Sequence, residues 1–144
     1  MKLFLIAGEP SGDNLGGALM AGLKELAPAV EFLGVGGPAM QAQGLESRFP
    51  MEELAVMGIW EVLPKYRALK ARIAETARAV ADERPDALIT IDSPDFCLRV
   101  AREARRLNPD LRTIHYVAPS VWAWRPGRAK KMAEVIDHVL AILP

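Results

Sequence analysis

Short apolar runs alternate with longer stretches of helical periodicity along the whole chain, and this alternation limits the fold more than any other feature. Such runs fit buried strands, whereas apolar side chains that recur every three or four positions fit helices packed on one face. The sequence predicts strands at residues 3–7, 31–35, 87–91, 113–117 and 138–143, and helices at residues 14–27, 40–43, 62–80, 94–107 and 128–136. Strands separated by helices pair in parallel through right-handed crossovers. We therefore predict a doubly wound, mostly parallel α/β sheet with helices on both faces.

Length and composition limit the number of domains and the kind of partner. A chain of 144 residues has room for one core, so we expect one domain over residues 1–144. Eighteen basic and eighteen acidic side chains cancel, which argues against a nucleic acid as the main partner, because such domains usually carry a basic excess. Cys97 is the only cysteine and the two histidines lack metal-ligand spacing, so we expect neither a disulfide nor a metal site.

A glycine-rich loop, "GEPSGDNLGG", follows the first predicted strand. Its four glycines match neither the dinucleotide fingerprint nor the P-loop, and it contains no lysine. One interpretation is a tight turn in which Ser11 caps the following helix. The other is a substrate loop, in which Ser11 and Asp13 bind sugar hydroxyls and Gly12 lets the substrate approach the backbone.

Two aspartates follow the strand predicted at residues 87–91, at the edge of the sheet where parallel α/β proteins bind ligands. Asp95 has a structural explanation, because Ser93 as N-cap and Pro94 as first helical residue predict a helix start that favours an acid. Asp92 has no evident capping duty. It is the candidate general base, since that role needs a partly desolvated carboxylate within reach of a hydroxyl. The alternative is that Asp92 is a partner of the helix N-terminus or a solvated loop acid.

The segment "YVAPSVWAWRPGRAKKM" combines two tryptophans with four basic side chains beyond the fourth predicted strand. Aromatic faces stack on sugars and basic groups bind phosphates, so Trp122, Trp124 and Arg125 are candidate substrate-binding residues. The alternative is that the tryptophans are core anchors and the charges a solvated helix start.

The segment "LAVMGIWEVLPKYRALKAR" joins an almost continuous apolar run to a basic helix without acids. This pattern is typical of contact with an anionic membrane surface, although burial of the apolar side chains is the alternative. No stretch approaches the ~20 apolar residues of a membrane span. The candidate membrane-contact residues are Val56, Met57, Ile59, Trp60, Val62, Leu63, Lys65 and Arg67.

Five motifs in order resemble those of the bacterial lipid-A-disaccharide synthases: "AGEPSGD", "GVGGPAMQAQG", "MEELAVMGIWEVL", "IDSPDF" and "IHYVAPSVWAWRPGRAKK". The resemblance implies a Rossmann-like domain of a GT-B glycosyltransferase, which is built from two such domains. The family transfers 2,3-diacylglucosamine from UDP to 2,3-diacylglucosamine 1-phosphate with inversion, and needs neither a metal nor a cofactor.

The resemblance also assigns roles within this chain. It implies that residues 1–144 are the N-terminal, acceptor-binding half, and that a C-terminal half supplies most of the UDP-sugar site. Asp92 becomes the best candidate for the base, with Asp95 second. The implied location is cytoplasmic and peripheral, on the inner face of the inner membrane, and a homo-oligomer is left open. The alternative functions are another sugar-nucleotide enzyme of the same architecture, such as an epimerase or a different glycosyltransferase, and a non-catalytic lipid-binding module.

Overall fold

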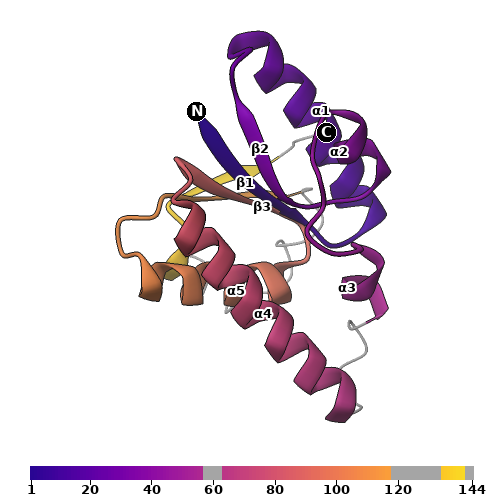
Figure 1. Ribbon diagram of the computed structural model, residues 1–144, viewed down its shortest axis with the longest axis vertical. Coiled ribbons are helices and arrows are strands. Elements are labelled where there is room, and N and C mark those ends of the chain that lie inside the picture. Colours follow the sequence, from indigo (N-terminus) through magenta and orange to yellow (C-terminus); the bar gives the residue numbers. More distant parts are fainter. Residues whose placement is uncertain (57–62, 118–133, 142–144) are drawn as a thin grey trace.

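The computed structural model describes residues 1–56, 63–117 and 134–141 of the chain (Figure 1). Its strands are β1 (Lys2–Ala7), β2 (Glu31–Val35), β3 (Ala87–Ile91), β4 (Thr113–Val117) and β5 (His138–Ala141). Its helices are α1 (Pro10–Leu26), α2 (Pro38–Ala42), α3 (Glu52–Val56), α4 (Leu63–Glu83) and α5 (Pro94–Leu107). The strand positions agree closely with those predicted from the apolar runs.

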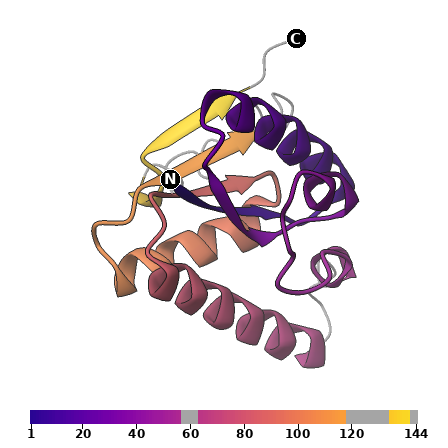
Figure 2. The same ribbon diagram turned by 45° about the horizontal axis from the view of Figure 1, so that its top comes forward.

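All the pairings in the sheet are parallel, and the strand order is β2-β1-β3-β4-β5. Since β1 lies between β2 and β3, the chain winds first to one side of β1 and then to the other. Figure 2 shows α4 and α5 on one face of the sheet and α1 with α2 on the opposite face. The predicted doubly wound α/β fold is confirmed, and the carboxyl ends of β1 and β3 lie side by side, where such sheets bind ligands.

Alternate side chains of the strands enter two separate cores, as the strand period of two requires. In β1, Phe4 and Ile6 face α4 and α5, whereas Leu3 and Leu5 face α1 and α2. Because β3 is covered on both faces, all five of its residues are buried. This double burial explains why the central strands read as continuous apolar runs.

Of the two helix caps considered from the sequence, Ser11 is wrong, and Ser93 is confirmed in position but not in its side-chain contact. The first helix begins at Pro10, four residues before its predicted start, so Ser11 lies in its first turn and Glu9 is the N-cap. Ser93 is the N-cap of α5, but it has a left-handed backbone (φ 41°, ψ 55°), and its side chain makes no capping hydrogen bond within the described part of the chain. An N-cap side chain reaches the helix from an extended backbone, which Ser93 lacks.

The element α3 also differs from prediction, because residues 52–56 form a short helix that the sequence pattern did not indicate. The strand predicted at residues 138–143 is present over His138–Ala141, and its last two predicted residues lie outside the described part of the chain. Of the helix predicted at residues 128–136, only the end falls within the described residues, where Glu134 and Val135 are helical.

A polar pair lies inside the core that α4 and α5 cover. Thr90 and His115 are register partners on β3 and β4, and each is 0% exposed. The Thr90 Oγ1 atom lies 2.6 Å from His115 Nδ1. Burial lowers the pKa of His115 to about 4 from its ordinary value of 6.5, because the charged imidazolium loses its hydration.

The protein should therefore lose stability as the pH falls from about 6.5 to about 4. Over this range the unfolded chain takes up a proton on His115 that the folded chain does not, so protonation favours unfolding. At ~1.4 kcal/mol per pKa unit, the loss has an upper limit of about 3.5 kcal/mol. Urea unfolding between pH 4 and 7 measures it. The decrease of the free energy of unfolding with falling pH should become smaller in His115→Gln. It should remain in His138→Gln, which replaces the exposed histidine. Equal decreases in both variants and in the unchanged protein would contradict the role of His115.

Candidate functional site

Asp92 lies directly beyond β3, at the carboxyl edge of the sheet. The residue is only 6% exposed, and its backbone N–H donates to the carbonyl oxygen of Tyr116 at 3.0 Å. Asp92 and Ser93 both have positive φ, at 50° and 41°. Such backbone costs about 1 kcal/mol or more per residue and concentrates at functional sites, where it aims a side chain. The turn thus holds a nearly buried carboxylate at the ligand-binding edge.

The surroundings of Cys97 argue against a nucleophilic role for this thiol. Burial raises the pKa of Cys97 far above its usual range, and the charges of Asp92 and Glu9 raise it further. A thiol held neutral in this way is a poor nucleophile.

Asp95 is exposed in the first turn of α5, where an acid interacts favourably with the helix dipole. Its burial differs sharply from that of Asp92, although only two residues separate them. A carboxylate that takes a proton from a substrate hydroxyl is more effective when it is partly shielded from water. The structure therefore favours Asp92 of the two candidates.

Asp13 has a structural duty that the sequence did not reveal. It is 4% exposed, and its carboxylate accepts hydrogen bonds from the backbone N–H groups of Gly37, Ala39 and Met40, each at 2.9 Å. These N–H groups stand at the start of α2, where an anion is favoured. The carboxylate of α1 thus occupies the place that a phosphate could take at this helix start.

Close packing explains the glycines of the loop after β1. A Cβ atom on Gly16 would lie 2.6 Å from Met40 Sδ and 2.9 Å from Ile91 Cδ1, and one on Gly12 would lie 3.3 Å from the Ile91 carbonyl oxygen. The glycines therefore let α1 approach both β3 and α2. Their spacing follows this packing instead of a phosphate fingerprint.

A pocket of about 620 Å³ opens between the start of α1, the start of α2 and α3. Its volume falls within the ~300–1,000 Å³ of small-molecule sites. It is lined by Gly8, Pro10, Asp13, Asn14, Pro38, Ala39, Met51 and Glu52. The pocket adjoins the Asp92 turn, because a Cβ atom on Gly8 would lie only 2.6 Å from Ser93 Oγ.

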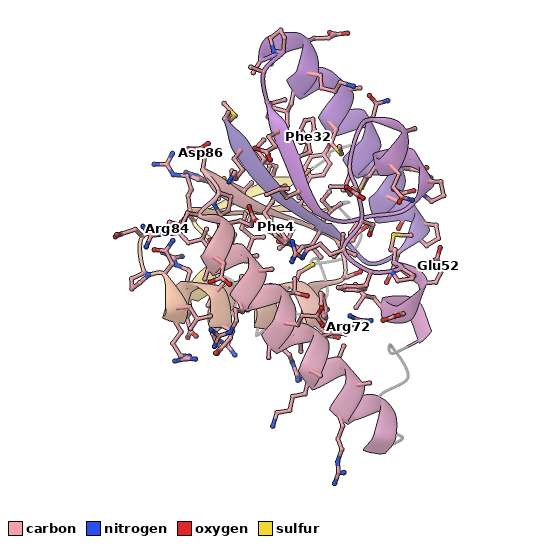
Figure 3. All side chains as sticks on the ribbon, viewed as in Figure 1. Phe4, Phe32, Glu52, Arg72, Arg84 and Asp86 are labelled. Atoms are coloured by element: carbon pink, nitrogen blue, oxygen red, sulfur yellow. The ribbon has the colours of Figure 1, made fainter. Side chains whose placement is uncertain are left out.

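Arg72 of α4 holds the α3 wall of this pocket in place (Figure 3). Its Nε atom donates to Glu53 Oε2 at 2.8 Å, and its guanidinium lies 4.4 Å from the centre of the Phe49 ring. Phe49 is itself buried, so Arg72 stacks on a fixed surface. The wall is therefore tied to the helix layer on the other face of the sheet.

The remaining predicted site residues divide between described and undescribed parts of the chain. Ser11 is exposed and Gly12 is buried against β3, both in the first turn of α1. Val56 ends α3, whereas Leu63, Lys65 and an exposed Arg67 stand in the first turns of α4. Outside the described residues lie Met57, Ile59, Trp60, Val62, Trp122, Trp124 and Arg125.

Sequence reasoning missed the pocket residues at the starts of α2 and α3. Pro38 and Ala39 begin α2, just before the helix predicted at residues 40–43, and Met51 and Glu52 lie at the start of α3, a helix that was not predicted. The available signal was positional, since Pro38 follows the carboxyl end of β2, next to that of β1.

Residues 1–56, 63–117 and 134–141 contain no group of three or more His, Cys, Asp or Glu side chains placed to hold a metal ion. Among those same residues, no helix combines the length and apolar character that a membrane span requires.

Known proteins are similar in sequence to this chain over nearly its whole length. The model of the family "Lipid-A-disaccharide synthetase" matches residues 3–144. The chain belongs to this family. The lipid-A-disaccharide synthase of Ruegeria pomeroyi is 71% identical over 144 residues, and that of Rhodospirillum centenum is 57% identical over 145. Both alignments cover all of this chain but 36% of the relative, so the chain spans about a third of the length of these synthases.

A solved structure, the spinosyn rhamnosyltransferase SpnG, is similar to this member of the family at the level of the chain trace. The match covers 95% of this chain and 39% of the rhamnosyltransferase, with a TM-score of 0.44 and 15% sequence identity.

Proposed function

We propose that this chain is the N-terminal, acceptor-binding part of a GT-B lipid-A-disaccharide synthase. The proposed reaction transfers 2,3-diacylglucosamine from UDP to 2,3-diacylglucosamine 1-phosphate, with the remainder of the synthase holding most of the UDP-sugar. The observation that carries the proposal is the nearly buried Asp92 in its strained turn at the carboxyl edge of the sheet, in a chain of this family.

In this mechanism the Asp92 carboxylate removes the proton from the acceptor 6-hydroxyl. The hydroxyl oxygen forms a bond to the anomeric carbon of the donor while the bond from that carbon to the UDP oxygen breaks on the opposite face. The proton ends on Asp92 and the electron pair leaves with UDP, which inverts the anomeric centre. A positioned general base of this kind typically accelerates a reaction ~10²–10⁴-fold.

A chimera tests the reaction directly, with this chain replacing the matching segment of the Ruegeria pomeroyi synthase, to which it is 71% identical. We expect UDP release and disaccharide formation with diacylated donor and acceptor. Turnover of non-acylated UDP-glucosamine at an equal rate would favour another sugar-nucleotide enzyme. A folded chimera that transfers neither sugar would contradict the proposal.

We also propose that the protein lies on the inner face of the cytoplasmic membrane, with α4 and α5 toward the anionic lipids. The whole chain is neutral, yet α4 carries five basic and three acidic residues and α5 carries four and two. Lys70 and Arg102 line a groove of about 280 Å³ between these helices, and the candidate membrane-contact residues immediately precede and begin α4. Basic side chains attract an anionic bilayer by ~1 kcal/mol each near its surface.

Vesicle sedimentation measures this contact. The protein should bind vesicles that contain phosphatidylglycerol, and Trp60→Ser and the pair Lys70→Glu with Arg102→Glu should each weaken binding several-fold, since they remove apolar contact and charge attraction. Lys24→Glu is the control, because it reverses a charge on α1 at the opposite face, and the single variant Lys70→Glu matches it in the size of the charge change. Equal losses in Lys24→Glu and in the double variant would contradict the proposed orientation.

A further inference from the structure

We propose that the pocket between α1, α2 and α3 holds a fatty acyl chain of the acceptor sugar. This inference rests on the proposed function, which supplies an acylated substrate, but the site is assigned from the pocket itself. Its volume of about 620 Å³ and its place beside the Asp92 turn are those of a substrate site.

The lining of the pocket selects a neutral, apolar group. Four of the eight lining residues, Pro10, Pro38, Ala39 and Met51, are apolar, and Gly8 presents only backbone. The ionisable lining residues that the structure describes are two acids and no base. Carboxylates at close range repel a phosphate or a diphosphate, so neither the acceptor phosphate nor the UDP fits here. An acyl chain carries no charge and gains from apolar burial.

The acid deepest in the pocket does not need a ligand. Both oxygens of Asp13 already accept hydrogen bonds from the backbone of the α2 start, and the residue is 4% exposed. Glu52 is exposed at the rim, where water can solvate its charge (Figure 3). The interior is therefore apolar in effect, although two acids belong to its lining.

The walls are fixed before any ligand binds. Asp13 ties the start of α2 to α1, and Arg72 ties α3 to α4 through Glu53. Leu54 of α3 is buried, with its Cδ1 atom 3.4 Å from the position of a Cβ on Gly8. A preformed pocket avoids the entropic cost of ordering its walls on binding.

The position of the pocket connects the acyl chain to the reaction and to the membrane. Gly8 lines the pocket and abuts Ser93, the neighbour of Asp92, so a chain held here leaves the sugar ring near the base. On its other side, α3 ends at Val56, where the segment proposed for membrane contact begins. The wall of the pocket is thus continuous in sequence with the surface that would receive acyl chains from the bilayer.

Methyl NMR on protein labelled with ¹³C-methyl methionine tests occupancy without catalysis. N-octanoylglucosamine should shift the Met51 methyl signal, whereas N-acetylglucosamine, which lacks the chain, should not. Met1, which is 64% exposed, is the internal control. An unmoved Met51 signal at millimolar octanoyl probe, or an equal shift with the acetyl probe, would overturn the inference.

A second arm measures chain-length dependence in the Ruegeria chimera. Each methylene removed from a buried acyl chain should lower kcat/KM for the acceptor by about fourfold. Asn14→Trp fills the pocket from α1 and should lower kcat/KM for long-chain acceptors at least tenfold, with little effect on a short-chain acceptor. Ala18→Trp is the control, because Ala18 is exposed one turn later on α1, outside the lining.

The outcomes of this arm separate the inference from the proposed function. Transfer that proceeds without chain-length dependence, or an equal loss in both tryptophan variants, would overturn the acyl site while the reaction stands. Absence of transfer from any sugar would count against the proposed function, and the Met51 signal would then still decide whether the pocket binds an acyl chain.

Discussion

Asp92→Asn should lower kcat for sugar transfer by about 10²–10⁴-fold in the chimera with the Ruegeria synthase, because the amide cannot accept the acceptor proton. Asparagine matches aspartate in size and tolerates left-handed backbone equally well, so the strained turn should survive the change. Steady-state kinetics measure the loss, and circular dichroism with thermal unfolding verifies the fold. KM for the acceptor should change little, since the proton transfer belongs to the transition state.

Asp95→Asn is the matched control for this result. It makes the same chemical change three residues later, at an exposed position in the first turn of α5, and should lower kcat by less than about threefold, with a stability loss within ~1 kcal/mol. A larger loss in Asp95→Asn than in Asp92→Asn would exchange the roles of the two residues. Near-normal turnover in both variants would show that neither aspartate is the general base.

Asp13→Ala should destabilise the chain by about 4 kcal/mol, a large share of the ~5–15 kcal/mol of a typical domain. The change leaves the N–H groups of Gly37, Ala39 and Met40 without their acceptor at the start of α2. Hydrogen bonds to a charged group contribute ~1.5–3 kcal/mol each, and these share one carboxylate. Urea unfolding measures the loss. The free energy of unfolding of Asp13→Asn, which keeps one carbonyl oxygen, should lie between that of Asp13→Ala and that of the unchanged protein.

Asp82→Ala controls for the loss of an acid from a helix. Asp82 is exposed near the end of α4, and its removal should change stability by less than ~0.5 kcal/mol. If Asp13→Ala and Asp82→Ala gave equal free energies of unfolding, the α1–α2 tie would contribute nothing, and Asp13 would be left with only its place in the pocket lining.

The fold was predictable because the spacing of apolar residues along the sequence reflects which faces of each strand and helix are buried. The strand at residues 87–91 is buried on both faces, so its apolar run was unambiguous, and the right-handed crossover rule fixed the winding. The helix starts were less predictable. Ser93 matched an N-cap by residue type, but its backbone conformation is set by the turn that Asp92 begins, which local preference does not encode.

The candidate site was predictable only where one residue carried the signal. Asp92 stood out as a polar residue at the end of an apolar strand, and the structure places it at the expected edge. The pocket depends on residues from three separate segments, and the segment containing Met51 and Glu52 has no periodicity of its own. Asp13 looked like a free carboxylate in the sequence because its partners are backbone groups more than twenty residues away.

Through its contacts with Glu53 and Phe49, Arg72 also connects two parts of the fold. It joins a short helix at the mouth of the pocket to α4, a helix of 21 residues in the basic layer. One side chain therefore joins the pocket wall on one side of the sheet to the helix layer on the other, so a substitution at Arg72 would loosen α3 and expose the ring of Phe49 at the same time.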